Sequence, residues 1–155
     1  MIRRATRADI DRVLGCLHAA FEPYRSQYTA EGFADTTLTR ETVVARLAKM
    51  AILIAEADGR VVGTIACQVV DGSSPREGHL RGMAVVPDFL GSGIAVRLLA
   101  AAEAVLHNAG CEVVTLDTTA PLQRAIRFYE RNGYRATGKV GDFYGMPLYE
   151  YAKGL

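Results

Sequence analysis

The sequence predicts an α/β fold built on a mixed, mostly antiparallel sheet. The dipeptide Asp58-Gly59 lies between two β-branched segments, which is the strongest short-range sign of an antiparallel hairpin. A helical segment at residues 94–108 separates two strand segments at residues 79–86 and 113–117. Such a crossover makes the two strands parallel, so the sheet is expected to be mixed.

Two helices are predicted in the N-terminal third of the chain. Thr6 and Asp9 form a capping-box pattern, apolar residues follow at helical spacing, and Pro23 ends this first helix. Thr39 is placed to cap the second helix through its side-chain oxygen. Residues 21–38 lie between them and show no clean periodicity, so no helix is predicted there.

Seven strands and two further helices complete the predicted order. The strands are expected at residues 2–5, 52–55, 60–70, 79–86, 113–117, 134–140 and 148–153. The remaining helices are expected at residues 94–108 and 121–131, each followed by a stop that contains Asn and Gly. Gly82 interrupts the fourth strand, and an interior glycine marks a bulge that would splay this strand from its neighbour.

Composition argues against several classes of partner. Half of the residues are hydrophobic and 23% are charged, as in ordinary globular domains, so residues 1–155 are expected to form a single domain. The 18 basic and 17 acidic residues are interspersed and leave a formal net charge of +1, so neither a nucleic acid nor a membrane is an expected partner. No apolar stretch reaches the length of about 18 residues that a membrane span requires.

The three cysteines favour a reducing compartment. Cys16, Cys67 and Cys111 are odd in number, far apart and set in apolar segments, unlike a disulfide framework or a metal site. The N-terminal residues also lack an apolar run of signal length. We therefore expect buried free thiols, no bound metal and a cytoplasmic protein.

The most informative stretch is residues 83–95, where a β-branched strand runs through Pro87 into a glycine turn that opens an amphipathic helix. Gly91 and Gly93 can adopt positive φ without a Cβ clash, and the free N–H groups of the first helical turn point at whatever lies there. Such a junction favours a phosphate or pyrophosphate, whose charge-assisted hydrogen bonds are worth about 1.5 to 3 kcal/mol each.

Spacing separates three kinds of ligand-binding glycine turn. A dinucleotide-binding turn needs a third Gly or Ala three residues after the second glycine, but Val96 stands there. A nucleoside-triphosphate loop needs a lysine after its last glycine, and neither Gly91 nor Gly93 is followed by one. A turn that binds no ligand stays an open alternative for this segment taken alone.

Two stretches together point to a known family. The first reads Leu90-Gly91-Ser92-Gly93-Ile94-Ala95, and the second reads Ala125-Ile-Arg-Phe-Tyr129-Glu-Arg-Asn-Gly-Tyr134. The first resembles the acyl-CoA loop of the GCN5-related N-acetyltransferases (the GNAT family), which has Gln or Arg, two residues, Gly, one residue, then Gly or Ala. The second resembles the family's other signature, which has Ala, three residues, Tyr, then Gly and an aromatic residue.

The order of elements extends this resemblance over the whole chain. It implies a GNAT-type sheet of about seven strands flanked by four helices, with the parallel pair splayed at the cofactor cleft. The chain departs from the family at two positions. Leu90 stands where the family has a polar side chain, and Leu122 stands where it often has Asn.

The resemblance implies acetyl-CoA as co-substrate and assigns it to the fourth strand and the glycine turn. The residues expected to bind it are Met83, Ala84, Val85, Leu90, Gly91, Ser92, Gly93, Ile94 and Ala95. The backbone of Met83 and Val85 would pair with pantetheine, and the Val85 amide would polarise the acetyl carbonyl. Because amides do not depend on their side chain, Leu90 removes at most one side-chain contact.

The resemblance also implies an acid and a base for acetyl transfer. Tyr129 would protonate the departing CoA thiolate, since a phenol with a pKa of about 10 stays protonated at neutral pH. A packing role is the alternative, because Tyr129 lies on an apolar helical stripe. The family's Glu position on the fourth strand holds His79, which could accept the proton of the attacking amine, and Glu77 is the alternative base.

The acceptor amine is left open. Residues 21–38 and 142–147 correspond to regions that set acceptor specificity in the family, and Asp117 and Thr118 end the neighbouring strand. The candidate acceptor-binding residues are Tyr24, Tyr28, Asp117, Thr118, Phe143 and Tyr144. They do not choose between a small amine, an amino acid and a peptide terminus. A catalytically silent acyl-CoA-binding module is the alternative to an N-acetyltransferase, and a homodimer is left open.

Overall fold

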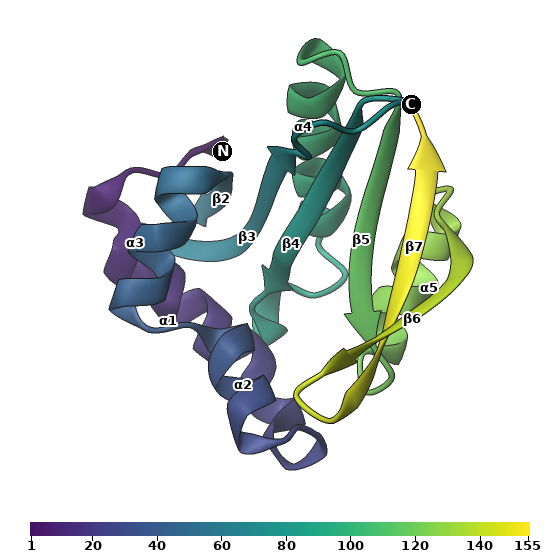
Figure 1. Cartoon of the computed structure of the whole chain (residues 1–155). Coiled ribbons are helices and arrows are strands. Elements are labelled where there is room, and N and C mark those ends of the chain that lie inside the picture. The colour runs from purple at the N-terminus through teal and green to yellow at the C-terminus, as the bar shows by residue number, and fades with distance from the viewer.

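A computed structural model describes residues 1–155 as one seven-stranded sheet covered by helices (Figure 1). The strands are β1 (Ile2–Arg4), β2 (Ala51–Ala57), β3 (Arg60–Val69), β4 (Glu77–Val85), β5 (Val113–Thr119), β6 (Arg135–Phe143) and β7 (Met146–Gly154). Their order in the sheet is β1-β2-β3-β4-β5-β7-β6. Every neighbouring pair is antiparallel except β4 and β5, so the predicted mixed sheet with one parallel pair is confirmed.

Five α-helices flank the sheet, one more than predicted. They are α1 (Ile10–Phe21), α2 (Ala30–Thr37), α3 (Arg40–Lys49), α4 (Ile94–Asn108) and α5 (Gln123–Arg131). Helix α2 falls in the segment for which no helix is predicted. It has only eight residues and buries only Gly32, Phe33 and Thr37, so no apolar stripe betrays it. Thr29 caps it by accepting a hydrogen bond from the Gly32 amide.

Short 3-10 helices lie in three of the connections between these elements. They are η1 (Arg7–Asp9), η2 (Glu22–Gln27) and η3 (Pro87–Phe89). The predicted capping pair acts in the first of them, where the Asp9 carboxylate accepts a hydrogen bond from the Thr6 amide at 2.8 Å. Thr39 is the N-cap of α3, as predicted, and its side chain accepts from the Thr42 amide.

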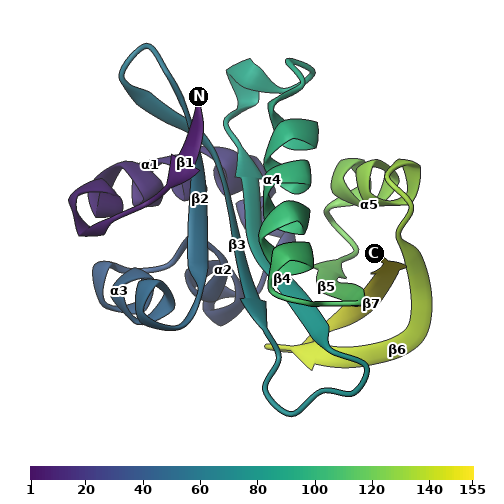
Figure 2. The same cartoon turned by 90° about the horizontal axis from the view of Figure 1, so that it is seen from above.

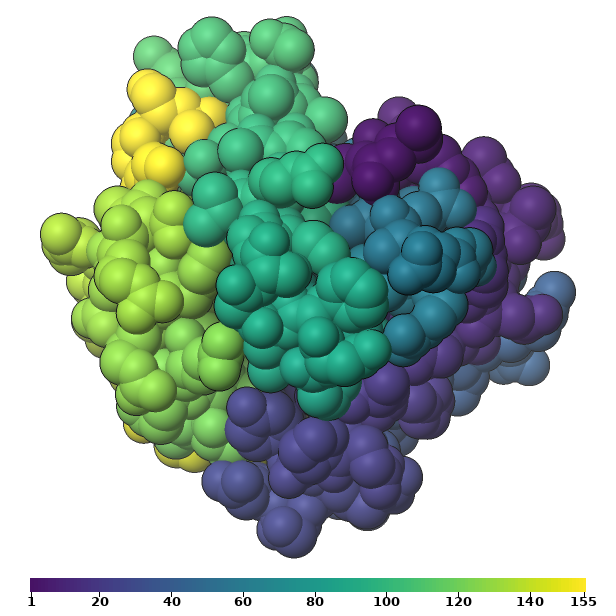
Figure 3. Space-filling model, turned by 180° about the vertical axis from the view of Figure 1, so that it is seen from behind, coloured from purple at the N-terminus to yellow at the C-terminus, as the bar shows by residue number.

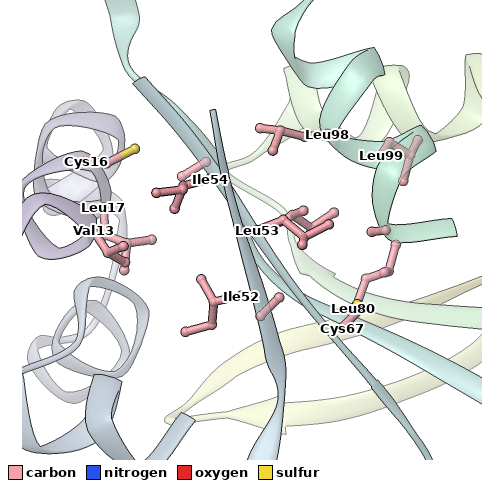
Figure 4. Close-up of a cluster of buried hydrophobic side chains, with 14 of the residues drawn as sticks. Val13, Cys16, Leu17, Ile52, Leu53, Ile54, Cys67, Leu80, Leu98 and Leu99 are labelled. Carbon is pink, nitrogen blue, oxygen red and sulfur yellow. The ribbon is translucent and has the colours of Figure 1, made fainter. Parts of the chain in front are cut away.

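The helices form one layer on each face of the sheet (Figure 2). Helices α1, α2 and α3 cover one face, and α4 and α5 cover the other. The close-up of the core shows Ile52 and Ile54 pointing toward α1, and Leu53, one step along β2, pointing toward Leu98 of α4 (Figure 4). Strand β3 is covered on both faces and is therefore buried almost continuously from Val61 to Cys67.

The three cysteines lie in the interior of the protein. Cys16, Cys67 and Cys111 are all buried and unpaired, which confirms the predicted free thiols. Burial raises the pKa of Cys16 to about 12 and of Cys67 to about 11, so neither is a reactive thiolate at neutral pH. No helix has both the length and the apolar character needed to cross a membrane.

The parallel pair separates halfway along its length. Strand β4 pairs with β5 only from Glu77 to Leu80, although both strands continue beyond that point. On the other side of β4 the register with β3 shifts between Thr64 and Ala66, and Gly82 sits in this bulge with a φ of 60°. The predicted bulge at Gly82 is confirmed, and it lies just beyond the point where the pairing of β4 with β5 ends.

Candidate functional site

Two cavities meet where β4 and β5 separate. One has a volume of about 460 Å³ and lies beside His79, and we call it the histidine cavity. The other has a volume of about 410 Å³ and lies beside the turn of Gly91 and Gly93, and we call it the glycine-turn cavity. Five residues line both cavities: Phe21, Met83, Leu122, Ala125 and Tyr129. The gap between the strands therefore forms a junction between two binding spaces.

The glycine-turn cavity has a floor of backbone amides. The Leu90 and Ser92 amides donate to the carbonyls of Pro87 and Phe89, at 3.3 and 3.2 Å, and so are not free for a ligand. The amides without a protein acceptor are those of Gly91, Gly93, Ile94, Ala95 and Val96. Five N–H groups at the start of α4 therefore form an anion-binding cradle, and Val96 joins it although the sequence does not single it out.

Two glycines shape this cradle. Gly91 and Gly93 have φ values of 78° and 87°, in the left-handed region that other residues adopt only with strain. Gly93 is also the N-cap of α4. No atom lies within 4 Å of where a Cβ would stand at either glycine, so space is open there for a ligand to touch the backbone.

The end of β4 turns one more amide toward the junction. The Val86 amide donates to the Val62 carbonyl at 2.9 Å, and Gly63 is the register partner of Val85. Hydrogen-bonded and non-hydrogen-bonded pairs alternate in an antiparallel ladder, so the Val85 N–H points away from β3. It therefore faces the side from which β5 has diverged.

The rest of the glycine-turn cavity is mostly apolar, with two arginines of α5 at its edge. Val85, Phe89 and Leu90 supply apolar walls, and Arg124 and Arg131 supply the charge. Tyr24 also lines this cavity. This candidate acceptor-binding residue therefore lies on the opposite side of the junction from His79. Figure 3 shows this face, where the green-teal turn lies between the yellow-green surface of α5 and the purple-blue surface of η2.

His79, which lines the histidine cavity, belongs to a chain of three polar side chains with Thr115 and Glu77. Thr115 donates its one hydroxyl proton to the Glu77 carboxylate at 2.7 Å, because a carboxylate can only accept. Its oxygen is 2.9 Å from Nδ1 of His79, so this contact requires His79 to donate from Nδ1. The neutral ring therefore carries its proton on Nδ1, and Nε2 has a free lone pair.

Nε2 of His79 faces a carboxylate across the cavity. It lies 3.5 Å from Oδ2 of Asp117, while the imidazole is only 17% exposed. Burial lowers the pKa of His79 below its usual 6.5, and Asp117 opposes this by favouring the charged ring. The imidazole is thus neutral at pH 7 and has a site ready to accept a proton.

Tyr129 stands at the junction itself. Its side chain is buried among Phe128 and Tyr134, with edge-to-face ring contacts at centroid distances of 5.5 and 5.8 Å. Burial raises the pKa of its phenol well above the usual value, so the hydroxyl is fully protonated at neutral pH. No protein group bonds to this hydroxyl, although the residue lines both cavities. Tyr129 therefore has the packing role and an unused donor at once.

The remaining predicted acceptor residues are placed in different ways. Tyr28 lines the histidine cavity, and its hydroxyl is 2.7 Å from Oγ1 of Thr119. Phe143 and Thr118 line the cavity as well, and Oγ1 of Thr118 is buried without a hydrogen-bond partner. Tyr144 is half exposed and lines neither cavity, but its carbonyl accepts from Thr29 and so fixes the β6–β7 turn against α2.

Four polar residues in or beside the histidine cavity escape sequence reasoning. They are Arg46, Gln68, Arg81 and Thr115. Alternation along β4 places Arg81 on the face of His79, which was the available signal for that residue. The others come from α3, β3 and β5 and meet only in the folded sheet. No group of three or more His, Cys, Asp or Glu side chains is arranged to hold a metal ion.

Comparison with known proteins gives one family. Residues 13–134 match the family described as "Acetyltransferase (GNAT) family". N-alpha-acetyltransferase MAK3 of Arabidopsis thaliana is 30% identical over 86 residues, which is 56% of this chain and 45% of that protein. The chain thus spans less than half the length of this relative. S-(2-succino)cysteine N-acetyltransferase of Bacillus subtilis is 29% identical over 142 residues, covering 88% of this chain and 85% of the other.

The fold is shared with solved structures. The PaiA N-acetyltransferase of Thermoplasma acidophilum, solved in complex with coenzyme A, superposes with a TM-score of 0.81. The match covers 100% of this chain and 98% of that one at 19% sequence identity. At this identity the likeness shows the fold.

Proposed function

The chain belongs to the GNAT acetyltransferase family, and from this premise we propose that it transfers an acetyl group from acetyl-CoA to an amine by direct attack. The observation that carries the proposal is the junction of the two cavities at Tyr129. One cavity offers a cradle for an anionic donor, and the other offers a base for the acceptor. Two substrates can therefore meet in the gap between β4 and β5.

The glycine-turn cavity fits the donor. Acetyl-CoA is a substrate here and supplies the acetyl group as a thioester. The five free amides from Gly91 to Val96 would hold its pyrophosphate, and Arg124 and Arg131 lie where they can meet further phosphate. The Val85 N–H, turned toward the junction, would donate to the acetyl oxygen as negative charge develops on it.

The histidine cavity fits the deprotonation of the acceptor. Only an unprotonated amine attacks a thioester, and an alkyl ammonium with a pKa of about 10.4 is almost wholly protonated at pH 7. Nε2 of His79 would accept that proton, while Asp117 at 3.5 Å stabilises the imidazolium that forms. Glu77 bonds to Thr115 and so orients the histidine, which favours His79 over Glu77 as the base.

Tyr129 would complete the reaction as general acid. The nitrogen–carbon bond forms, the carbon–sulfur bond breaks, and the departing thiolate takes the phenolic proton. A raised phenol pKa keeps that proton in place until negative charge appears on the sulfur. The unbonded hydroxyl at the junction supports this role.

We propose one domain over residues 1–155 and a reducing, cytoplasmic setting that suits three buried thiols. The acceptor classes are those of the relatives: the plant protein is named for N-alpha-acetylation, and the Bacillus protein for acetylation of a modified cysteine.

The test is release of free CoA thiol from acetyl-CoA with a panel of amines, alongside calorimetry with CoA. We expect CoA to bind and at least one amine to stimulate thiol release. Tight CoA binding without turnover on any amine would favour a silent acyl-CoA-binding module, for which Leu90 and Leu122 are the supporting residues. Absence of CoA binding would exclude both the acetyltransferase and the silent acyl-CoA-binding module.

A further inference from the structure

Two guanidinium groups of the histidine cavity have no assigned purpose. Arg46 of α3 and Arg81 of β4 both line the cavity. Arg81 has one carboxylate near it, Asp35 of α2, at 3.6 Å. Arg46 forms no hydrogen bond or ion pair through its side chain, although it is largely covered. One carboxylate thus stands beside two cations, which leaves a positive charge uncompensated in this part of the cavity.

An unpaired guanidinium in this position is costly unless a ligand uses it. Burial, followed by the nearby charge of Arg81, lowers the pKa of Arg46 to about 10, so the group stays charged at pH 7. Nη1 of Arg46 reaches the β4 bulge, only 2.5 Å from where a Cβ would stand at Gly82. The guanidinium of Arg46 therefore lies beside the point where β4 and β5 separate. Planar forks of this kind suit carboxylates, to which they can donate two parallel bonds.

The opposite charge lies at the other part of the same cavity. Asp117 and Nε2 of His79 form the region that attracts an amine. His79 and Arg81 are two residues apart on one face of β4, which corresponds to roughly 6.5 Å along the strand. The cavity therefore presents a negative group beside His79 and positive groups farther along its wall. A small zwitterion, with its ammonium toward Asp117 and its carboxylate toward Arg46, matches both.

We propose that the acceptor is an amino acid or a related small amine with a free carboxylate, and that Arg46, assisted by Arg81, binds that carboxylate. This inference rests on the proposed acetyl transfer and names the acceptor class. A peptide N-terminus lacks the free α-carboxylate beside its amine and would leave Arg46 unpaired. The family match alone does not separate these acceptors, since the relatives include enzymes named for both kinds.

The test compares each amino acid with its own carboxamide. We measure kcat/KM for thiol release and, independently, the thermal shift caused by each compound in the presence of CoA. For the unmodified protein, kcat/KM should be about 10- to 100-fold higher for the acid than for the amide, the range expected for a charge-assisted bond. Arg46→Met should reduce this preference to within about threefold, mainly through KM, with CoA affinity unchanged.

Matched variants keep the outcome decisive. Arg46→Lys should retain part of the preference, because the charge remains and the fork is lost. Arg81→Gln, at a more exposed position, should lower it less than Arg46→Met does. Arg7→Met is the control, since Arg7 is exposed and lines neither cavity. The preference of this variant for the acid over the amide should equal that of the unmodified protein.

Any of four results would overturn the proposal. They are equal use and binding of acids and amides, a preference for peptides, an acid-over-amide preference that survives Arg46→Met, and failure to bind any amino acid. The binding measurement separates this proposal from acetyl transfer. Acids that stabilise the protein more than their amides, without thiol release from any amine, would refute the transferase and keep the carboxylate site.

Discussion

The two cavities that meet at Tyr129 are built from different parts of the chain. The glycine-turn cavity takes most of its hydrogen-bond donors from backbone amides of one short segment, from Gly91 to Val96, with two arginines at its edge. The histidine cavity takes its polar groups from side chains on α2, α3, β3, β4 and β5. A backbone site tolerates many sequences, whereas a side-chain site changes with every substitution. The donor can therefore stay the same while the acceptor changes.

Tyr129 lines both cavities, and its substitution is expected to give the largest effect. Tyr129→Phe keeps the packed ring and removes only the hydroxyl, so the fold and CoA affinity should survive. Turnover should fall by roughly 10² to 10⁴, the usual worth of a positioned general acid. Single-turnover kinetics and CoA calorimetry provide the measurement. A lower melting temperature with normal specific activity would make Tyr129 a packing residue only.

The glycine-turn cavity should respond to backbone strain alone. Gly93→Val forces a β-branched residue toward a φ of 87° and should displace the amides that follow it. Losing one such bond costs about 1.5 to 3 kcal/mol, so CoA affinity should fall about 100-fold. Leu90→Ala is the matched control and should change affinity little. Equal CoA affinity in Gly93→Val would show that the cradle lies elsewhere.

The histidine cavity should respond to side-chain chemistry and to pH. His79→Gln should lower turnover about 10- to 100-fold without changing CoA affinity, because water can replace a base in part. The neutral imidazole is the active form, and burial lowers its pKa below 6.5. The kcat/KM of the unmodified protein should therefore hold near pH 7 and decline only below 6.5, and the variant should lose this decline. A pH profile identical in the two proteins would exclude His79 as the base.

The smallest effect is expected at Thr118, whose hydroxyl is buried and unpaired. Thr118→Val keeps the shape and removes the orphan group, so the free energy of unfolding should rise by about 1 kcal/mol. If a bound substrate uses the hydroxyl, KM should rise a few-fold in the same variant. Denaturant titration and steady-state kinetics measure the two quantities. A less stable variant would mean that the hydroxyl already has a partner inside the protein.

The difference between the cavities also explains what could be predicted from sequence. The glycine turn depends on neighbours in the chain, so its positive φ angles and the start of the helix could be predicted from Gly91 and Gly93 alone. The exact set of free amides could not, because those of Leu90 and Ser92 bond within the turn. The antiparallel pairing of β2 with β3 followed from a hairpin turn, and the parallel pairing of β4 with β5 followed from a helical crossover, and both signals are local as well. Helix α2 was missed because its eight residues bury too few apolar side chains to produce a period.

The features of the site that could not be predicted depend on contacts between residues far apart in the sequence. The sequence alone does not favour His79 or Glu77 as the base, and the proposal of His79 rests on the register that pairs His79 with Thr115, 36 residues away. Arg46 and Arg81 belong to a helix and a strand that carry no shared pattern. Tyr24 and Tyr144 were grouped with the acceptor site by their segments, yet one lines the other cavity and the second lines neither.

Gly82 links the bulge of β4 to the arginine of α3, and this has an evolutionary consequence. A Cβ at position 82 would lie 2.5 Å from Nη1 of Arg46, so a larger residue there requires the guanidinium to move. Positions 46 and 82 should therefore covary among descendants of a common ancestor. Glycine at 82 permits a long residue at 46, and a bulkier residue at 82 selects a shorter one. A substitution at position 82 would then be inherited together with a changed residue at position 46 and a new acceptor preference.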